Sequence, residues 1–232
     1  MKSVNVKLLG EGNYLTQEAY KTLRTSIQFC GQDIKVIALT SCNEDDGKSS
    51  IALQLAKNFS DIKRNVLLLD ADMRKSVLAS RDTDGADIQG LSEVLSGMAT
   101  IQECIYNTQY EQLFIMFAGQ YPPDPVELLN SKHFDHVIEV VRKTFDYIII
   151  DTPPLGLVID AAVITSHCDG AALVISDKKT KIAVAQDVVN KIRNSGCRVL
   201  GVIKNNKRKK VASGYGYRYG KKKYYYYKNT EK

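Results

Sequence analysis

The chain has 232 residues, of which 44% are hydrophobic and 25% are charged, a composition typical of one globular domain with an ample core. No apolar run approaches the roughly 18 residues of a membrane-spanning helix and no signal peptide opens the chain, so we expect a cytoplasmic protein without a membrane span. The formal net charge of +6 is uneven, because residues 204–232 carry +10 and the rest of the chain carries −4.

The cysteines and histidines show no metal-binding pattern. The cysteines are odd in number and scattered, which is typical of reduced cytosolic thiols: Cys30, Cys42, Cys104, Cys168 and Cys197. The histidines have no spacing with cysteines or acids that would indicate a metal ligand set, so we interpret them as surface or core residues: His133, His136 and His167.

The first predicted helix follows an irregular lead-in. Residues 1–15 lack a clear period, whereas Thr16 to Phe29 has apolar residues at helical spacing, with Thr16 as a plausible cap. Glu18, Lys21 and Arg24 lie on one side of this helix. On spacing alone this side is a solvated face.

The next stretch has the order of a phosphate-binding loop. A short apolar strand, residues 36–41, and a helix, residues 48–60, flank Gly47-Lys48-Ser49. Gly47 lets the backbone turn its amides toward phosphate, Lys48 can reach the β- and γ-phosphates, and the Ser49 hydroxyl can hold Mg²⁺. The general pattern has glycine where this chain has Cys42, so the strict motif fails and, taken alone, the stretch favours an ordinary helix start.

Two later strands end in carboxylates. The apolar strand at residues 65–70 ends in Asp70 and is followed by Asp72, and the strand after Phe145 ends in Asp151 before Thr-Pro-Pro. Open α/β sheets bind ligands at the carboxyl ends of their strands, so these acids are candidates for a nucleotide and Mg²⁺ site.

The remaining elements continue the alternation of strands and helices. We expect short helical pieces at 91–95 and 101–105, a strand at 113–118, a helix with Pro125 in its first turn, and a helix at 134–145. A helix from about residue 159, a strand at 171–176, a helix at 181–194 and a strand at 199–203 complete the pattern. This alternation predicts an α/β fold with a mostly parallel sheet flanked by helices and right-handed crossovers.

The last segment differs from everything before it. It is basic, it contains seven of the 13 tyrosines, and it has no apolar period, so we divide the chain into a globular domain at 1–205 and a flexible arm at 206–232. Such an arm can bind single-stranded nucleic acid, lie on an anionic membrane, or present tyrosines as phosphate acceptors. Composition alone does not separate these possibilities.

Together these motifs resemble the bacterial tyrosine kinases of capsule and exopolysaccharide operons, in their free-standing form. The family's loop reads roughly Thr-Ser-x-x-Pro-Gly-Glu-Gly-Lys-Ser; here Thr40, Ser41 and residues 47–49 match, while residues 44–46 are Glu-Asp-Asp. Its Asp-x-Asp-x-Arg motif matches Asp70, Asp72 and Arg74. The resemblance covers nearly the whole chain.

The resemblance implies a P-loop fold of the MinD-like type that uses ATP and Mg²⁺. It implies catalytic roles for Lys48, Asp70, Asp72 and Asp151. It places nucleotide contacts on Asp46, Gly47, Lys48, Ser49, Ser50, Arg74 and Asn205, with Asn205 at the adenine. It places Mg²⁺ at Ser49, Asp70, Asp72 and Asp151.

The resemblance also implies that the chain assembles and phosphorylates its own tail in trans. A homo-oligomeric ring, an octamer in the family, would use Glu18, Lys21 and Arg24 on the helix at 16–29. The acceptors would be Tyr215, Tyr217, Tyr219, Tyr224, Tyr225, Tyr226 and Tyr227.

The resemblance has further implications for partners, location and output. The cytosolic segment of a membrane-embedded chain-length regulator would activate the kinase at the inner face of the membrane. A cognate tyrosine phosphatase would reverse the reaction, no stable nucleic-acid partner is expected, and the output would be control of polysaccharide synthesis and export.

Two alternatives remain at this level. A MinD/ParA-like positioning ATPase shares the fold, but such proteins usually carry a second lysine early in the loop, and residues 42–46 contain none. A non-catalytic module could use the basic aromatic arm on nucleic acid or membrane.

Overall fold

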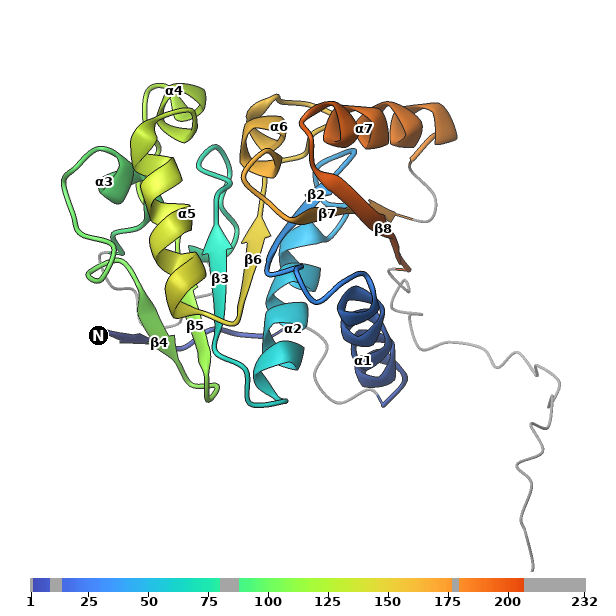
Figure 1. The fold of residues 1–232 in the computed structure, drawn as a ribbon, viewed down its shortest axis with the longest axis horizontal. Coiled ribbons are helices and arrows are strands. Elements are labelled where there is room, and N and C mark those ends of the chain that lie inside the picture. Colours follow the sequence, from blue (N-terminus) through green and yellow to red (C-terminus); the bar gives the residue numbers. More distant parts are fainter. Residues whose placement is uncertain (1, 9–13, 80–87, 177–179, 207–232) are drawn as a thin grey trace, which may run out of the picture.

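One mixed sheet forms the centre of the molecule in the computed structural model, which describes residues 2–8, 14–79, 88–176 and 180–206 (Figure 1). The strand order is β1-β4-β5-β3-β6-β2-β7-β8, and every neighbouring pair is parallel except β4 and β5. The strands are β1 (Ser3–Val4), β2 (Val36–Ser41), β3 (Val66–Asp70), β4 (Tyr106–Thr108), β5 (Leu113–Met116), β6 (Tyr147–Asp151), β7 (Gly170–Ser176) and β8 (Arg198–Asn205). The predicted mostly parallel α/β fold is confirmed.

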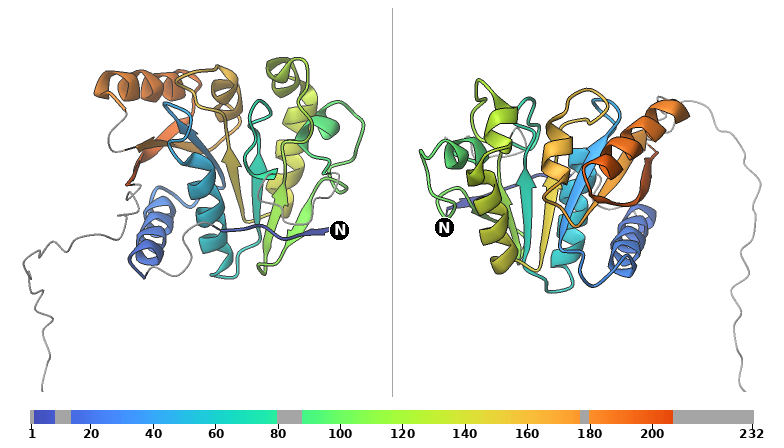
Figure 2. Two further views of the ribbon diagram at one scale, coloured as in Figure 1. Left: turned by 180° about the vertical axis from the view of Figure 1, so that it is seen from behind. Right: turned by 45° about the horizontal axis from the view of Figure 1, so that its top comes forward.

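Helices cover both faces of this sheet. They are α1 (Tyr14–Phe29), α2 (Lys48–Ser60), α3 (Leu91–Leu95), α4 (Pro125–Leu129), α5 (Lys132–Thr144), α6 (Asp160–Thr165) and α7 (Ile182–Asn194). In Figure 1 α5 lies in front of the strands, and from behind, in the left panel of Figure 2, α2 lies over the sheet with α1 beside it. No helix among the described residues is long and apolar enough to cross a membrane.

Each face of the sheet packs against its own apolar core, because the side chains along a strand alternate between the two faces. Val66 and Leu68 of β3 belong to the cluster that contains apolar residues of α1 and α2, while Leu67 and Leu69 belong to the cluster with α5. Successive strand residues point to opposite faces, so a strand covered on both faces is apolar throughout. This explains why the central strands read as continuous hydrophobic runs.

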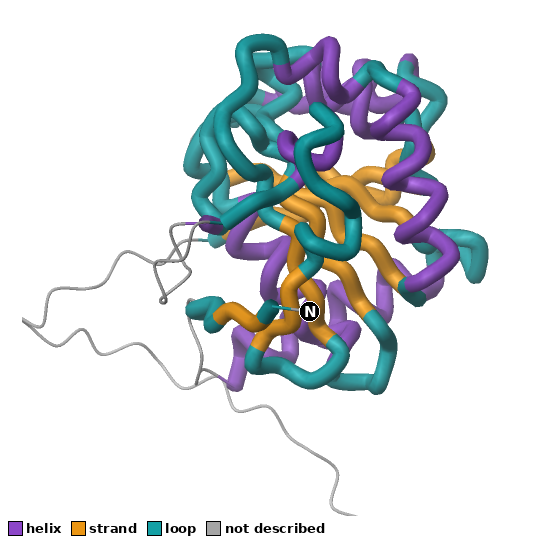
Figure 3. Tube along the Cα trace, turned by 90° about the vertical axis from the view of Figure 1, so that its left-hand side faces the viewer, coloured by secondary structure: helices purple, strands orange, loops and turns teal. Residues whose placement is uncertain are grey.

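Three predictions about the elements were wrong. Residues 101–105 form turns instead of a helix, because this short segment leads directly into β4, which begins at Tyr106. The predicted irregular lead-in contains β1, which pairs with β4 at the sheet edge facing the viewer in Figure 3. Helix α1 begins at Tyr14, so Thr16 lies within its first turn and is not its cap.

The arrangement of β3, β6 and β2 brings three carboxyl ends together. These strands are consecutive neighbours, with Asp70 opposite Asp151 and Leu39 of β2 also opposite Asp151. The loop after β2 and the acids of β3 and β6 therefore meet at one edge, as the sequence predicted.

Candidate active site

The loop between β2 and α2 is held in a tight turn by its own side chains. Gly47, directly before α2, has φ +94°, and Asp45 has φ +59° where the resembled family has glycine. Both angles lie in the left-handed region, which glycine adopts freely and aspartate tolerates better than most residues. The loop thus takes the compact shape without the usual glycine at position 45.

Asp46 turns away from the space that a phosphate would occupy. Its side chain is buried, and its Oδ2 accepts a hydrogen bond from the Asn43 amide at 3.0 Å. From the end of β8, Asn205 Nδ2 donates to the Asp46 carbonyl at 2.8 Å. The sequence suggested an acid beside phosphate, but this carboxylate instead fastens the loop, and Asn205 lies next to it.

Lys48 lies at the centre of the acidic groups. Its Nζ is 3.0 Å from Asp72 Oδ2, 3.4 Å from Ser49 Oγ and 3.5 Å from Asp151 Oδ1. Burial lowers the pKa of Lys48, but the carboxylates of Asp151 and Asp72 outweigh it, and the net effect raises the pKa. The lysine is therefore a buried cation at neutral pH.

Asp70 is enclosed by the loop that follows it. Its Oδ1 accepts a hydrogen bond from the Asp72 amide at 3.1 Å, and its Oδ2 accepts one from Ser76 Oγ at 2.5 Å. Burial, and next the Asp151 carboxylate, raise the pKa of Asp70 to about 8. Asp70 thus shapes the loop that carries Asp72.

Asp151 keeps unused capacity to accept a ligand. Burial raises its pKa, although the Lys48 ammonium and the Ser49 hydroxyl oppose the shift. Its buried Oδ1 is within ion-pair distance of Lys48 but accepts no hydrogen bond from the described residues. Buried polar atoms nearly always have partners, so this oxygen suits a bound cation or its water.

The side chains at this site suit Mg²⁺ only when nucleotide phosphates provide further ligands. Among the described residues no three His, Cys, Asp or Glu side chains form a metal-binding group. Mg²⁺ in nucleotide sites usually binds one or two carboxylates, waters and the phosphates themselves. The oxygens of Ser49 and Asp151 fit such a shared site, whereas both oxygens of Asp70 are already hydrogen bonded.

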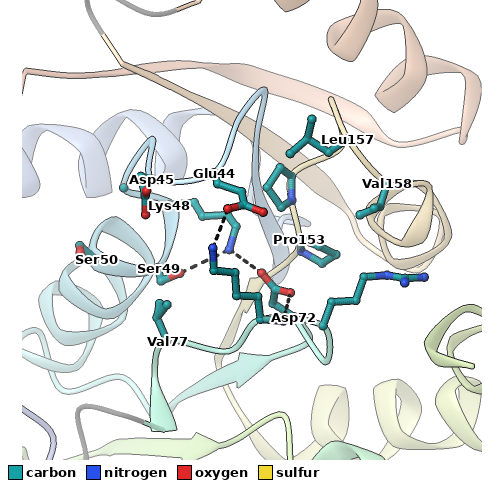
Figure 4. Close-up of a pocket in the computed structure, with 14 residues that line it drawn as sticks. Glu44, Asp45, Lys48, Ser49, Ser50, Asp72, Val77, Pro153, Leu157 and Val158 are labelled. Carbon is teal, nitrogen blue, oxygen red and sulfur yellow. Dashed lines mark hydrogen bonds and ion pairs between the residues drawn. The ribbon is translucent and has the colours of Figure 1, made fainter. Parts of the chain in front are cut away.

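A cavity of about 290 Å³ opens between the phosphate-binding loop and the loops after β3 and β6 (Figure 4). Its polar lining consists of Glu44, Asp45, Gly47, Lys48, Ser49, Ser50, Asp72, Arg74 and Lys75. Its apolar lining consists of Val77, Pro153, Pro154, Leu157 and Val158. The predicted residues Asp46, Asp70, Asp151 and Asn205 lie outside this lining.

Two charge pairs at the cavity were not predicted from the sequence. Lys75 Nζ is 2.6 Å from Glu44 Oε2, which joins the loops on two sides of the cavity. Arg74 forms two hydrogen bonds to Asp160, at the first residue of α6. The partners are 31 and 86 residues apart, so no local spacing could have indicated them.

The predicted oligomerisation residues do not act as one group within the protomer. Lys21 Nζ and Glu18 Oε1 form an exposed ion pair at 2.8 Å. Arg24 instead turns toward α2, where its Nη1 donates to the Asn58 carbonyl at 2.9 Å. The seven predicted acceptor tyrosines lie outside the described residues.

Comparison with known proteins gives consistent matches over most of the chain. A family profile described as an AAA domain matches residues 34–195. Tyrosine-protein kinase CpsD of Streptococcus agalactiae is 39% identical over 209 residues, which cover 89% of this chain and 91% of that protein. The kinase domain of the Escherichia coli tyrosine kinase ETK superposes with a TM-score of 0.77 at 28% identity, covering 87% of this chain and 80% of that domain.

The fold is also shared with a nucleotide-binding ATPase. The septum site-determining protein MinD of Pyrococcus horikoshii, solved with Mg-ADP, has a TM-score of 0.60 at 25% identity and covers 72% of this chain and 68% of its own. The kinase domain thus matches more of the chain, and more closely, than this ATPase does.

Proposed function

The chain belongs to the bacterial tyrosine-protein kinases, and from this premise we propose that it transfers a phosphoryl group from ATP to tyrosines of its own C-terminal tail in a second copy. The observation that carries the proposal is the group around Lys48, where a buried ammonium lies within 3.5 Å of two carboxylates beside a phosphate-binding loop. The output would be control of capsular or exopolysaccharide synthesis and export.

ATP would bind with its phosphates on the loop. The backbone amides of residues 46–50 and Lys48 would hold the phosphates, and Asn205, beside the loop, would contact the adenine. Ser49 and Asp151 would hold Mg²⁺. When bound, the Mg²⁺–nucleotide supplies the phosphoryl group and part of the charge neutralisation that its transfer needs.

Asp72 is the acid best placed to act on the acceptor. It lines the cavity and Asp70 does not. Asp70 holds the Asp72 amide, and Lys48 contacts Asp72 Oδ2, so both fix the direction of this carboxylate. Asp72 would then orient or deprotonate the tyrosine hydroxyl, while Asp70 supports it. The cavity lining supports this proposed division of roles between the two acids.

Partners and location follow the same proposal. The acceptors would be the tail tyrosines at 215–227, delivered between copies of a ring that uses Glu18, Lys21 and Arg24. A membrane-embedded regulator would activate the kinase at the inner face of the membrane, and a phosphatase would reset it. The exposed Glu18–Lys21 pair supports a contact on α1, because neither charge is buried within the protomer.

One blot separates the candidate functions. The wild type, Lys48→Met and the control Lys57→Met, which changes a partly exposed lysine on the same helix, are incubated with Mg-ATP and probed for phosphotyrosine. We expect signal in the wild type and the control and none in Lys48→Met, because a central phosphate-binding cation is lost. ATP hydrolysis without phosphotyrosine in the wild type would instead favour a positioning ATPase.

A further inference from the structure

Asp160 is a buried acid whose side chain hydrogen-bonds to Arg74 in the described structure. It is 1% exposed, and its two oxygens accept hydrogen bonds from Arg74, Nε to Oδ2 at 2.7 Å and Nη2 to Oδ1 at 3.2 Å. This two-point geometry fixes the plane of the guanidinium as well as its position. A lysine at position 74 could not be oriented in this way.

Arg74 is held at the wall of the candidate active site. It lines the cavity together with Lys48 and Asp72, and its side chain is 35% exposed. Asp160 takes two of the five guanidinium N–H groups, and no other hydrogen bond of the Arg74 side chain occurs among the described residues. The remaining donors are therefore available to an anion in the cavity.

Stability alone is a weak explanation for this pair. A buried ion pair often contributes little net stability, because removing both charges from water offsets their attraction. A cation held rigidly at the wall of a ligand site can stabilise charge that develops on the ligand, since the cation does not have to reorganise during the reaction. The position of the pair thus favours a role toward the ligand.

We propose that Asp160 is a positioning residue that orients the guanidinium of Arg74 toward the phosphoryl group being transferred, at the cavity wall formed by the loops after β3 and β6. The inference rests on the proposed kinase function and adds to it a residue that no motif identified. Lys48 would neutralise the phosphates from the loop, and Arg74 would add donors from the other side of the cavity.

The first experiment measures transfer and binding separately. In Asp160→Asn we expect kcat for tyrosine phosphorylation to fall about ten- to a hundredfold, the scale of a misplaced catalytic group, while the Kd of a fluorescent ATP analogue changes by less than about twofold. Folding should survive, because Arg74 is partly exposed and water can solvate its charge. The control Asp124→Asn removes a nearby charge that acts on Arg74 through space, keeps a good helix cap, and should leave kcat unchanged.

A double-mutant cycle then tests whether Asp160 acts through Arg74. Asp160→Asn should lower kcat in the wild type and have no further effect beside Arg74→Ala. Because Arg74→Ala leaves a buried carboxylate unpaired, Arg74→Ala/Asp160→Ala provides a variant without that charge. If Arg74→Ala does not fold, the cycle uses Arg74→Lys.

Several results would overturn the inference. They are an unchanged kcat in Asp160→Asn, an effect that persists without Arg74, and a parallel loss of melting temperature, Kd and kcat, which would make the pair structural. In each of these cases the wild type still phosphorylates tyrosine, so the inference is rejected and the proposed function stands. Absence of phosphotyrosine in the wild type would instead reject the proposed function together with the inference.

Discussion

The two ends of the sheet use aspartate in opposite ways. At the carboxyl end, Asp151 keeps an oxygen without a hydrogen bond in the described structure. At the other end, Asp169 lies directly before β7, and its Oδ2 accepts hydrogen bonds from the amides of Lys35 and Val36 at 2.8 and 2.7 Å. The Arg142 guanidinium adds an ion pair to Asp169 at 2.9 Å, and Lys35 Nζ hydrogen-bonds the Arg142 carbonyl.

This difference distinguishes binding capacity from stability. The hydrogen bonds and the ion pair of Asp169 join β2, β7 and α5, so both of its oxygens already have partners within the fold. The carboxyl end keeps raised carboxyl pKa values beside a cavity, a feature that proteins retain where a ligand will supply the missing interactions.

The largest effect is expected for Asp151→Asn. The initial rate of tyrosine phosphorylation should fall about 10²- to 10³-fold, as when one group that stabilises transition-state charge is removed. Stability at pH 8 should change little, because asparagine removes a buried charge while Asp72 still pairs with Lys48. Burial raises the carboxyl pKa, so the folded wild type loses stability as the pH rises above the unfolded pKa of about 4, and asparagine removes that loss. Urea unfolding in EDTA at pH 5 and 8 checks the sign, and a large destabilisation at pH 8 would contradict it.

Asp169→Ala should show the reverse pattern. Leaving two backbone amides and Arg142 without their acceptor should cost about 2–4 kcal/mol of unfolding free energy, while kcat below the melting temperature stays unchanged. Asp33→Ala is the matched control, because it removes an acid from a largely exposed pair with Arg198. If Asp169→Ala lowers kcat in fully folded protein, the two ends are coupled and the comparison fails.

Two buried cysteines with equal chemistry report on local opening. Cys42 follows β2 at the site and Cys197 precedes β8; burial raises the pKa of each thiol to about 11. At pH 8 iodoacetamide should modify Cys42 several times faster, because the strained loop opens more readily, and Mg-ATP should remove the difference. Raising the pH to 10 should speed both reactions, as the thiolate fraction increases. Equal rates at pH 8, measured by mass spectrometry, would show that the site is as rigid as the opposite end.

The smallest change in stability is expected for Lys21→Ala. Its pair with Glu18 is exposed, so the unfolding free energy should stay close to that of the wild type. The proposed contact lies between copies, so sedimentation velocity should detect smaller species at equal concentration. An unchanged distribution of species would exclude Lys21 from the assembly contact.

Features of this protein that depend on local sequence patterns could be predicted from the sequence alone. The apolar runs that end in Asp70 and Asp151, and Gly47-Lys48-Ser49 between a strand and a helix, are local patterns, and parallel strands bring their carboxyl ends to one edge. The fold class and the placement of Lys48 among acids followed directly. The two-residue strand β1 could not be predicted, because so short a segment has no measurable period.

The surroundings of each acid came from the tertiary structure and not from the sequence. The inward turn of Asp46, the bond from Ser76 to Asp70 and the position of Asp72 at the cavity depend on how the loops pack. The pairing of Arg74 with Asp160 joins residues 86 positions apart. Burial and distant partners set the pKa and direction of each side chain, and both arise only when the chain has folded.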